Sequence, residues 1–551
     1  MKEKYADFLK QLALKPGQVE LRGYQVEMAE RVLRNGNSLV IMPTALGKTY
    51  VAAFVIAKFL KEERSSLGKK KKILFLTPTK PLALQQSQRL REWLEFEGTR
   101  INWGKEEATE VMVLSGETEP ALRERLWANP ILEIVCATPQ TVEYDLLAGR
   151  VSMEAFRLVV FDEVHRAVKE HSYAFLAKEA AKQHAFILGL TASPSSKREV
   201  IQEICTNLNI ANIEVRDEND KDVQGYAKPV KLDWIFVELP KAFMDIKSVL
   251  EELLKDALAE LLELEVVDST DLKRHKRALL DARRKALELS TMRPEGYRAL
   301  SVQARAMNVS HALDLLETEG IHALWGFMQE MGKRKQKSKA VKGLLQDFRW
   351  KLIGIKCEEL RKQGVEHPKF RRLKGVVSDA VQEGKSVIVF AHYRNTVTKI
   401  VEELNQFAGV KAKAFVGKSK EGMNQKKQAQ VLQEFKSKSF NVLVATSVAE
   451  EGIDVPSVDL VVFFEAVPSE IRAIQRRGRT GRVREGNTIV LITRKSKDEA
   501  FFWISKQREK KMRSTLHELR KELKSIGNKE QIGVEEQEEL IVGNQKNILD
   551  F

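Results

Sequence analysis

Two separate blocks of this chain alternate short, unbroken runs of Val, Ile and Leu with amphipathic stretches, and this pattern constrains the fold most. The runs show little polar alternation, which is typical of strands that are covered on both faces. Parallel sheets wrapped by helices contain such strands, so we expect two α/β domains. In the first block the runs are Ser38–Met42, Lys72–Pro78, Glu110–Ser115, Ile131–Pro139, Arg157–Asp162 and Ala185–Thr191, and in the second they are Ser386–Ala391, Ala412–Val416, Asn441–Val448, Asp459–Phe464 and Thr488–Thr493.

Between these blocks lies a stretch with a helical period and no strand signal. From Val249 to Leu262, apolar residues recur at i, i+3 and i+4, and similar stretches follow around 271–290 and 302–317. This spacing predicts amphipathic helices, so we expect an all-α domain inserted between the two α/β domains. The expected divisions are 1–240, 241–367 and 368–500, followed by a C-terminal helix and a polar tail at 501–551.

The composition favours a globular protein with a polyanionic partner. With 92 Lys and Arg against 77 Asp and Glu among 551 residues, the formal net charge is +15. Such a surplus favours nucleic acid or an acidic membrane surface as the partner. The longest apolar runs are far shorter than the ~20 residues of a spanning helix, so we expect no membrane segment. The 3 cysteines form no CxxC pair, which favours a reducing, cytoplasmic setting without structural zinc.

A candidate phosphate-binding loop lies between an apolar run and an apolar helix. Backbone N–H groups at the start of a helix can hold phosphates in such a loop. Lys48 would reach the outer phosphate oxygens of a nucleoside triphosphate, and the hydroxyl of Thr49 is a candidate ligand for Mg²⁺. The residues expected to contact the nucleotide here are Pro43, Thr44, Ala45, Leu46, Gly47, Lys48 and Thr49.

Two further motifs supply the other groups that phosphoryl transfer needs. Asp162 and Glu163 end an apolar run, where Asp162 can hold Mg²⁺ through water and Glu163 can polarise the attacking water. The segment Gln475–Arg482 contains 4 arginines in the second α/β block. Arginines from a separate domain can neutralise transition-state charge, so hydrolysis would depend on both blocks closing together.

Together these motifs resemble those of a superfamily-two helicase, over about residues 18–485. The resemblance implies two RecA-like motor domains that use ATP and Mg²⁺, with Arg22 and Gln25 reading adenine. It implies that Gly452 and Asp454 contact the nucleotide and that Gln475, Arg479 and Arg482 support hydrolysis. The residues implied in nucleic-acid contact are Thr79, Lys80, Gly116, Thr138, Thr141, Tyr393, Arg394 and Thr446, and those implied in coupling are His165, Thr191 and Ser193.

The chain resembles the Hef and FANCM branch more closely. The phrases nearly identical to that branch are Ala137–Glu143, Asp145–Arg150, His165–Val168, Asp459–Phe463 and Gln475–Arg482. The resemblance implies action on forked and branched DNA, with translocation from 3′ to 5′. Many archaeal members also carry an ERCC4-type nuclease, and no motif of that nuclease occurs in this sequence, which resembles the helicase part alone. Ala45 stands where the family usually has glycine.

Two other functions compete with a DNA helicase. The helical insert is shared with Dicer and with the viral-RNA-sensing helicases, so a double-stranded RNA translocase is the first alternative. The second is a clamp that binds DNA and uses ATP only as a switch. The last seven residues resemble a peptide that binds the sliding clamp PCNA, because Gln545, Ile548 and Phe551 recur at intervals of three.

Overall fold

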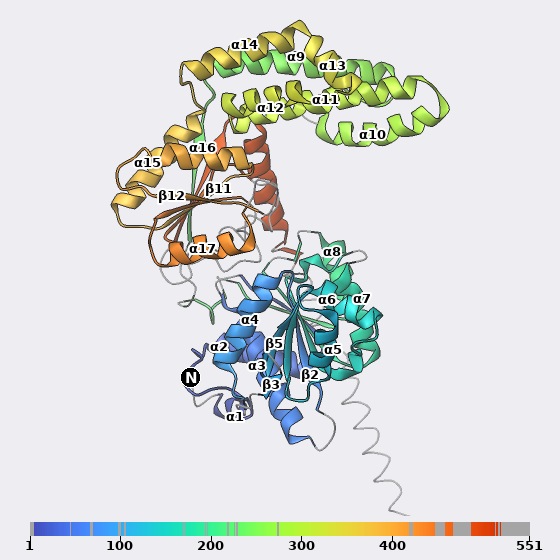
Figure 1. Cartoon of the computed structure of the whole chain (residues 1–551), viewed down its shortest axis with the longest axis vertical. Coiled ribbons are helices and arrows are strands. Elements are labelled where there is room, and N and C mark those ends of the chain that lie inside the picture. Colours follow the sequence, from blue (N-terminus) through green and yellow to red (C-terminus); the bar gives the residue numbers. More distant parts are fainter. Residues whose placement is uncertain are drawn as a thin grey trace, which may run out of the picture.

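A computed structural model of the chain has two parallel α/β domains and a separate helical domain (Figure 1). This confirms the fold class predicted from the sequence. The residues that the structure describes are 5–43, 46–66, 70–96, 101–103, 106–168, 171–192, 194–195, 197–217, 220–224, 226, 230–272, 275–417, 423–446, 458–466, 486–512, 514–515 and 518.

The first domain contains a seven-stranded parallel sheet in the order β5-β6-β2-β7-β8-β1-β9. Successive residues of β1 belong to two different cores, with Leu39 in one cluster and Val40 in the other, so both faces of the sheet are covered. The strands are β1 (Ser38–Ile41), β2 (Lys72–Leu76), β5 (Val111–Leu114), β6 (Ile134–Ala137), β7 (Phe156–Asp162), β8 (Phe186–Thr191) and β9 (Asn212–Val215). A small antiparallel pair, β3 (Ile101–Trp103) and β4 (Glu106–Ala108), stands apart.

Helices cover both faces of this sheet. One core contains buried residues of α2, α3 and α4, and the other contains buried residues of α5, α6, α7 and α8. The helices of this domain are α1 (Ala6–Lys10), α2 (Gly23–Asn35), α3 (Lys48–Ser65), α4 (Lys80–Trp93), α5 (Pro120–Ala128), α6 (Pro139–Leu147), α7 (Ser172–Lys182) and α8 (Arg198–Asn207).

The second domain contains a six-stranded parallel sheet in the order β10-β15-β14-β11-β13-β12. Val389 and Phe390 of β11 again lie in two different cores, on opposite faces of the sheet. The strands are β10 (Val230–Val237), β11 (Val387–Phe390), β12 (Ala412–Phe415), β13 (Val442–Ala445), β14 (Leu460–Phe463) and β15 (Gly486–Thr493), and the helices are α15 (Pro368–Gln382), α16 (Arg394–Leu404) and α17 (Gln425–Lys436).

The expected boundary of the first domain at residue 240 is wrong in one respect. β10 precedes that boundary, but it pairs in parallel with β15 over its whole length and therefore belongs to the second sheet. The physical reason is that β10 is an edge strand whose one partner comes from the far end of the chain. The charged residues Lys231 and Asp233 also interrupt the apolar run that marks the other strands.

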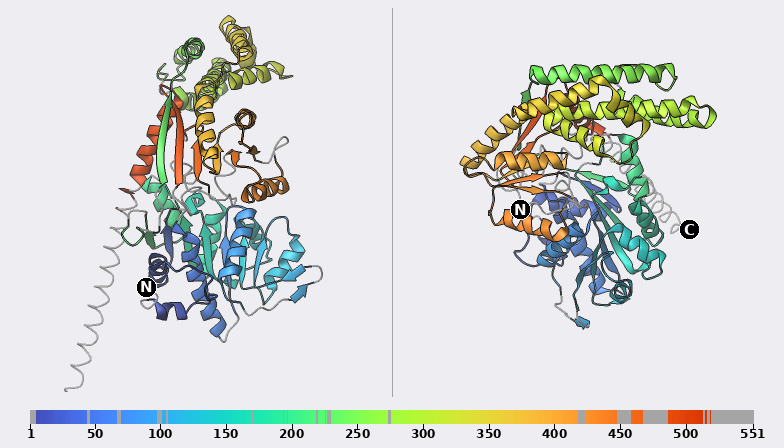
Figure 2. Two further views of the ribbon diagram at one scale, coloured as in Figure 1. Left: turned by 90° about the vertical axis from the view of Figure 1, so that its left-hand side faces the viewer. Right: turned by 45° about the horizontal axis from the view of Figure 1, so that its top comes forward.

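The inserted domain is entirely helical, as its periodicity predicts, and its helices share one buried core (Figure 1). It extends away from the first domain and lies beside α16 and the second sheet (Figure 2). Its helices are α9 (Lys241–Glu263), α10 (His275–Met292), α11 (Glu295–Thr318), α12 (Ile321–Lys333), α13 (Lys339–Gln346) and α14 (Phe348–Lys362).

A C-terminal helix over residues 497–512 contacts both α/β domains. Phe502 belongs to a buried core of the second domain, whereas Met512 belongs to the core that includes Ile204 of α8 in the first. Among the described residues, none of the helices combines the length and the apolar character needed to cross a membrane.

Candidate nucleotide and strand-contact site

The phosphate loop joins β1 to α3, as the sequence predicts. Gly47 precedes α3 with φ at +79°, in the left-handed region that favours glycine. A Cβ at this position would lie 2.6 Å from Gln25 Nε2 and 2.9 Å from Tyr50 Cδ2. The loop therefore needs glycine here for its backbone conformation and for the close approach of Gln25. Thr44 and Ala45 lie outside the described residues.

Lys48 is the first residue of α3 and is buried. Its Nζ donates to the carbonyl of Met42 at 3.3 Å, so the side chain folds back over the loop. Thr49 follows it and is half-buried, with Pro43 and Leu46 flanking the loop. A cation and a hydroxyl at a helix N-terminus are the groups that a nucleotide phosphate and its magnesium ion require.

Gln25 ties the segment before β1 to this loop. Its Nε2 donates to the carbonyl of Leu46 at 2.8 Å, and the hydroxyl of Tyr24 donates to the same carbonyl at 2.9 Å. Arg22 lies 3.5 Å from that hydroxyl. Within the described residues, the buried Oε1 of Gln25 has no hydrogen-bond partner. A buried acceptor without a partner fits a site that a polar ligand such as adenine completes.

The two predicted acidic residues lie at the carboxyl end of β7. Glu163 has φ at +53°, an uncommon conformation for a residue other than glycine, and its N–H donates to Asp162 Oδ1 at 3.0 Å. Burial, and next the charge of Glu163, raise the pKa of Asp162 to about 7, while Lys48 opposes this shift. A divalent cation would favour the ionised carboxylates, so this donor set fits Mg²⁺.

Three side chains around this acidic pair fix its position. His165 Nδ1 lies 3.4 Å from Glu163 Oε2, and Tyr173 Oη donates to the carbonyl of Asp162 at 2.8 Å. Gln86 of α4 places its Nε2 3.5 Å from Asp162 Oδ2, and its own buried Oε1 has no partner among the described residues. No motif in the sequence marks Tyr173 or Gln86, because packing alone brings these two side chains to β7.

The predicted strand-contact residues of the first domain follow β2, β5 and β6, at the same edge of the sheet as the phosphate loop. Thr79 and Thr138 are the N-caps of α4 and α6, and neither side chain caps its helix within the described structure. Thr138 Oγ1 instead lies 2.9 Å from Thr141 Oγ1. Lys80 forms an ion pair of 2.5 Å with Glu117, next to Gly116. Helix N-termini at this edge suit contacts to phosphates.

The second domain presents a matching set. Tyr393 is the N-cap of α16 after β11, and Arg394 Nη2 donates to the carbonyl of Gly417 at 2.9 Å. Thr446 is buried directly after β13. The ring of His311 in the insert lies 6.1 Å from that of Tyr393, so the insert touches this site. Burial raises the pKa of Tyr393 to about 12.

Thr191 is the remaining predicted residue within the described part of the chain. Thr191 ends β8, is buried, and its carbonyl accepts from the N–H of Met42 at 3.1 Å. It therefore connects β8 directly to the start of the phosphate loop. The predicted residues outside the described part of the chain are Thr44, Ala45, Ser193, Gly452, Asp454, Gln475, Arg479, Arg482, Gln545, Ile548 and Phe551.

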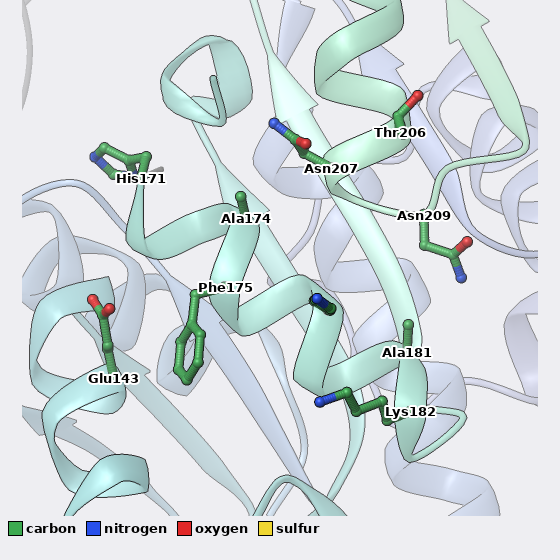
Figure 3. A pocket seen from close by; sticks show the side chains of 10 residues that line it. Glu143, His171, Ala174, Phe175, Ala181, Lys182, Thr206, Asn207 and Asn209 are labelled. Atoms are coloured by element: carbon green, nitrogen blue, oxygen red, sulfur yellow. The ribbon is translucent and has the colours of Figure 1, made fainter. Parts of the chain in front are cut away.

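A surface pocket of about 810 Å³ lies over α6, α7 and α8 (Figure 3). Glu143 and Phe175 lie on one side of α7, and Asn207 and Asn209 lie on the other. Its described lining contains none of the residues predicted from the motifs, so this pocket is separate from the nucleotide site.

Three family models match consecutive parts of the chain. "DEAD/DEAH box helicase" matches residues 22–201, and "Helicase conserved C-terminal domain" matches residues 368–484. Between them, "Putative ATP-dependent RNA helicase, helical bundle" matches residues 242–361.

Similar proteins and a solved structure agree with these models. The chain is 36% identical to "Putative ATP-dependent RNA helicase MJ1505" of Methanocaldococcus jannaschii, over 92% of this chain and 62% of that protein. It is 32% identical to "ATP-dependent DNA helicase mph1" of Neurospora crassa, over 88% of this chain and 42% of that protein. The crystal structure of the Hef helicase domain of Pyrococcus furiosus matches with 38% identity and a TM-score of 0.67, over 90% of this chain and 100% of that chain.

The two sheets, the helical insert and these matches define an ATP-dependent helicase of superfamily two. Within that class, the chain belongs to the family of Hef and FANCM helicases.

Proposed function

We propose that this chain uses ATP to unwind or remodel forked and branched DNA, moving from 3′ to 5′ along one strand. The observation that carries the proposal is the shared edge of the first sheet, where Lys48, Asp162 and the strand-contact residues after β2 and β6 all lie. Relatives support DNA as the substrate, because the Neurospora protein is named a DNA helicase and the chicken relative is named Fanconi anemia group M protein.

In this proposal the first domain binds ATP between the phosphate loop and the acidic pair. Lys48 holds the outer phosphates, Gln25 accepts a hydrogen bond from adenine, and Glu163 accepts a proton from the attacking water. Thr49 and Asp162 would hold Mg²⁺, which neutralises phosphate charge when it is bound. Gln475, Arg479 and Arg482 of the second domain would complete the site, together with Gly452 and Asp454.

Strand binding would be independent of sequence. Contacts from helix N-termini and from Lys80 and Arg394 go to phosphate and sugar, which carry little base information. The insert would contribute to fork binding through the cations between Lys333 and Lys339, which join α12 to α13, and Lys333, Arg334, Lys335 and Lys339 are exposed there.

The rate of ATP hydrolysis with different nucleic acids tests the proposal. Forked DNA should raise the rate of ATP hydrolysis by the full chain more than blunt duplex DNA does, and duplex RNA should raise it least. A double-stranded RNA translocase is the second candidate, because the Methanocaldococcus relative and the helical-bundle model are both named for an RNA helicase. Stronger stimulation by duplex RNA than by any DNA would favour that candidate.

We also propose that the C-terminal residues bind a sliding clamp such as PCNA and that the chain acts in the cytoplasm. Gln545, Ile548 and Phe551 carry the clamp proposal, and the three cysteines, which are free thiols, support a reducing setting. Titration of the clamp against the full chain and against Phe551→Ala tests the first point. Equal affinity of both proteins for the clamp would contradict it.

A further inference from the structure

Two partly exposed indole rings flank the ring of Phe502 at the edge of the second sheet, where β10 meets the C-terminal helix. We define the aromatic patch as Trp234 of β10 together with Phe502, Trp503 and Lys506 of helix 497–512. Lys506 Nζ lies 4.8 Å from the ring centroid of Trp234, 5.5 Å from that of Trp503 and 5.9 Å from that of Phe502. One ammonium group therefore contacts three aromatic rings.

The patch is built on a rigid base. Phe502 is buried in the second domain, and its ring meets those of Trp234 and Trp503 edge-on at 5.0 Å in both cases. Both indoles nevertheless stay open to solvent, since Trp234 is 37% exposed and Trp503 is 49% exposed. Packing within the chain buries Phe502 but leaves both indoles partly exposed, with Lys506 Nζ near each ring, and exposed aromatic rings gathered in this way mark a contact surface.

The charges around the patch favour an anionic partner. Arg494 lies over the neighbouring ring of Phe236 at 5.4 Å, and Lys510 is exposed one turn beyond Lys506. Two of the acidic residues nearby are paired within the chain, because Asp233 lies 3.2 Å from Lys231 and Glu238 lies 3.8 Å from Arg494. Aromatic faces for the bases and cations for the phosphates are the combination that binds single-stranded nucleic acid.

We propose that the aromatic patch is a second binding site for single-stranded DNA, in which unpaired bases stack on Trp503 and Trp234 and Lys506 pairs with a phosphate. The site is distinct from the strand-contact residues at the carboxyl edges of the sheets. It rests on the proposed action at forks, since a fork that is being opened supplies a free strand. Helix 497–512 also reaches the first domain through Met512, so a bound strand would lie on an element that joins both motor domains.

The test measures binding of a short fluorescent oligothymidylate to the full chain without ATP. Trp503→Ala should weaken binding at least about fivefold, because stacking of one base on an aromatic ring changes affinity by about five- to 150-fold. Lys506→Ala should weaken binding and reduce its salt dependence, and Trp503→Phe should retain part of the affinity. The matched control is Phe348→Ala, which removes a ring that is 73% exposed on α14 of the insert.

Thermal unfolding of each variant separates loss of binding from loss of folding, and Trp503 is exposed enough to be replaced without damage to the core. Unchanged oligonucleotide affinity in both Trp503→Ala and Lys506→Ala would overturn the proposal and assign the patch to a protein contact. The proposed function fails separately, if forked DNA does not stimulate ATP hydrolysis by the unaltered chain. Even if forked DNA does not stimulate hydrolysis, loss of oligothymidylate binding in Trp503→Ala would still support single-strand binding by the aromatic patch.

Discussion

Lys369 of α15 and Asp498 of helix 497–512 form a buried ion pair, with exposed side-chain fractions of 0% and 1%. Lys369 Nζ also lies 3.4 Å from the carbonyl of Thr318, at the end of α11 in the insert. The pair therefore ties together the first helix of the second domain, the C-terminal helix and the insert. Burial raises the pKa of Asp498, and the charge of Lys369 opposes that shift.

Asp498→Asn should lower the free energy of unfolding by about 3–5 kcal/mol, because it leaves the Lys369 ammonium buried without a counter-charge. Chemical denaturation of the full chain measures this change. The matched control is Glu358→Gln, which breaks the exposed pair of Lys362 and Glu358 at 3.0 Å and should cost less than about 1 kcal/mol. Equal losses of unfolding free energy from the two substitutions would show that the buried ion pair does not stabilise the contact between these elements.

His367 should make the chain less stable as the pH falls. Its ring is fully buried, Nδ1 accepts from Lys369 N at 3.2 Å, and Nε2 lies 3.0 Å from the carbonyl of Glu317. Burial, and next the charge of Lys369, lower the pKa of His367 from 6.5 to about 3. Because the folded pKa is depressed, its contribution to stability is complete above about pH 6.5 and is lost progressively toward pH 3.

His367→Asn removes this titration and keeps an N-cap acceptor for α15. The stability difference between the unaltered chain and this variant should shrink as the pH falls below about 6.5, by up to ~1.4 kcal/mol per pH unit. His184→Asn is the control, since His184 is exposed and has φ at +54°, which asparagine tolerates. A difference that stays constant between pH 7 and 5 would contradict the assigned neutral state.

Glu319→Gln should stabilise the chain at neutral and higher pH. Glu319 follows α11 of the insert and is buried, and burial, and next the charge of Glu465, raise its pKa well above 4.5. Glu465 accepts from the N–H of His392 at 2.8 Å, and its charge favours the protonated form of Glu319. Because its folded pKa is raised, its contribution is complete below about pH 4.5 and is lost as the pH rises.

The glutamine variant carries no charge, so its stability should fall less between pH 6 and 8 than that of the unaltered chain. Each unit by which folding raises the pKa is worth ~1.4 kcal/mol. Glu288→Gln, on the exposed side of α10, should leave the pH dependence unchanged. A glutamine variant that is less stable than the unaltered chain at pH 8 would show that Glu319 is ionised and needed as a carboxylate.

Gly47→Ala should reduce ATP hydrolysis more than tenfold, since the added Cβ would meet Gln25 Nε2 at 2.6 Å and force the loop to move. Gly36→Ala is a close control. Gly36 has φ at +81° and ψ at −150°, a region that essentially only glycine adopts, so alanine costs about 1–3 kcal/mol of stability there, but nothing lies within 4 Å of the added Cβ. The control should lose stability and keep its activity. Equal hydrolysis rates in both variants would contradict the role of Gly47 in shaping the loop.

Sequence patterns predict the buried strands and the motif residues of the first domain, because each depends on local order along the chain. Lys48, Asp162 and Thr138 lie where the motifs indicate. The apolar pattern does not predict β9, because its four residues include Asn212 and Glu214, which interrupt any apolar run. β10 could not be assigned to a sheet, since its pairing with β15 joins segments far apart in the sequence.

Contacts between elements escape prediction for the same reason. Gln86 reaches Asp162 only because α4 packs beside β7, and Glu319 meets Glu465 only because the insert docks on the second domain. Neither residue belongs to a motif, and a lone Gln or Glu on an amphipathic stretch gives no signal of burial. The charged interface between the insert and the second domain can therefore be identified only from the structure.

Strand separation tests the central claim most directly. The full chain is mixed with a labelled forked DNA, ATP and Mg²⁺, and the displaced strand is measured over time beside Glu163→Gln. Our account predicts that the unaltered chain displaces the strand, and that Glu163→Gln binds ATP and the fork but displaces almost none. Displacement at the same rate by Glu163→Gln, or none by a chain that hydrolyses ATP on the fork, would contradict the account.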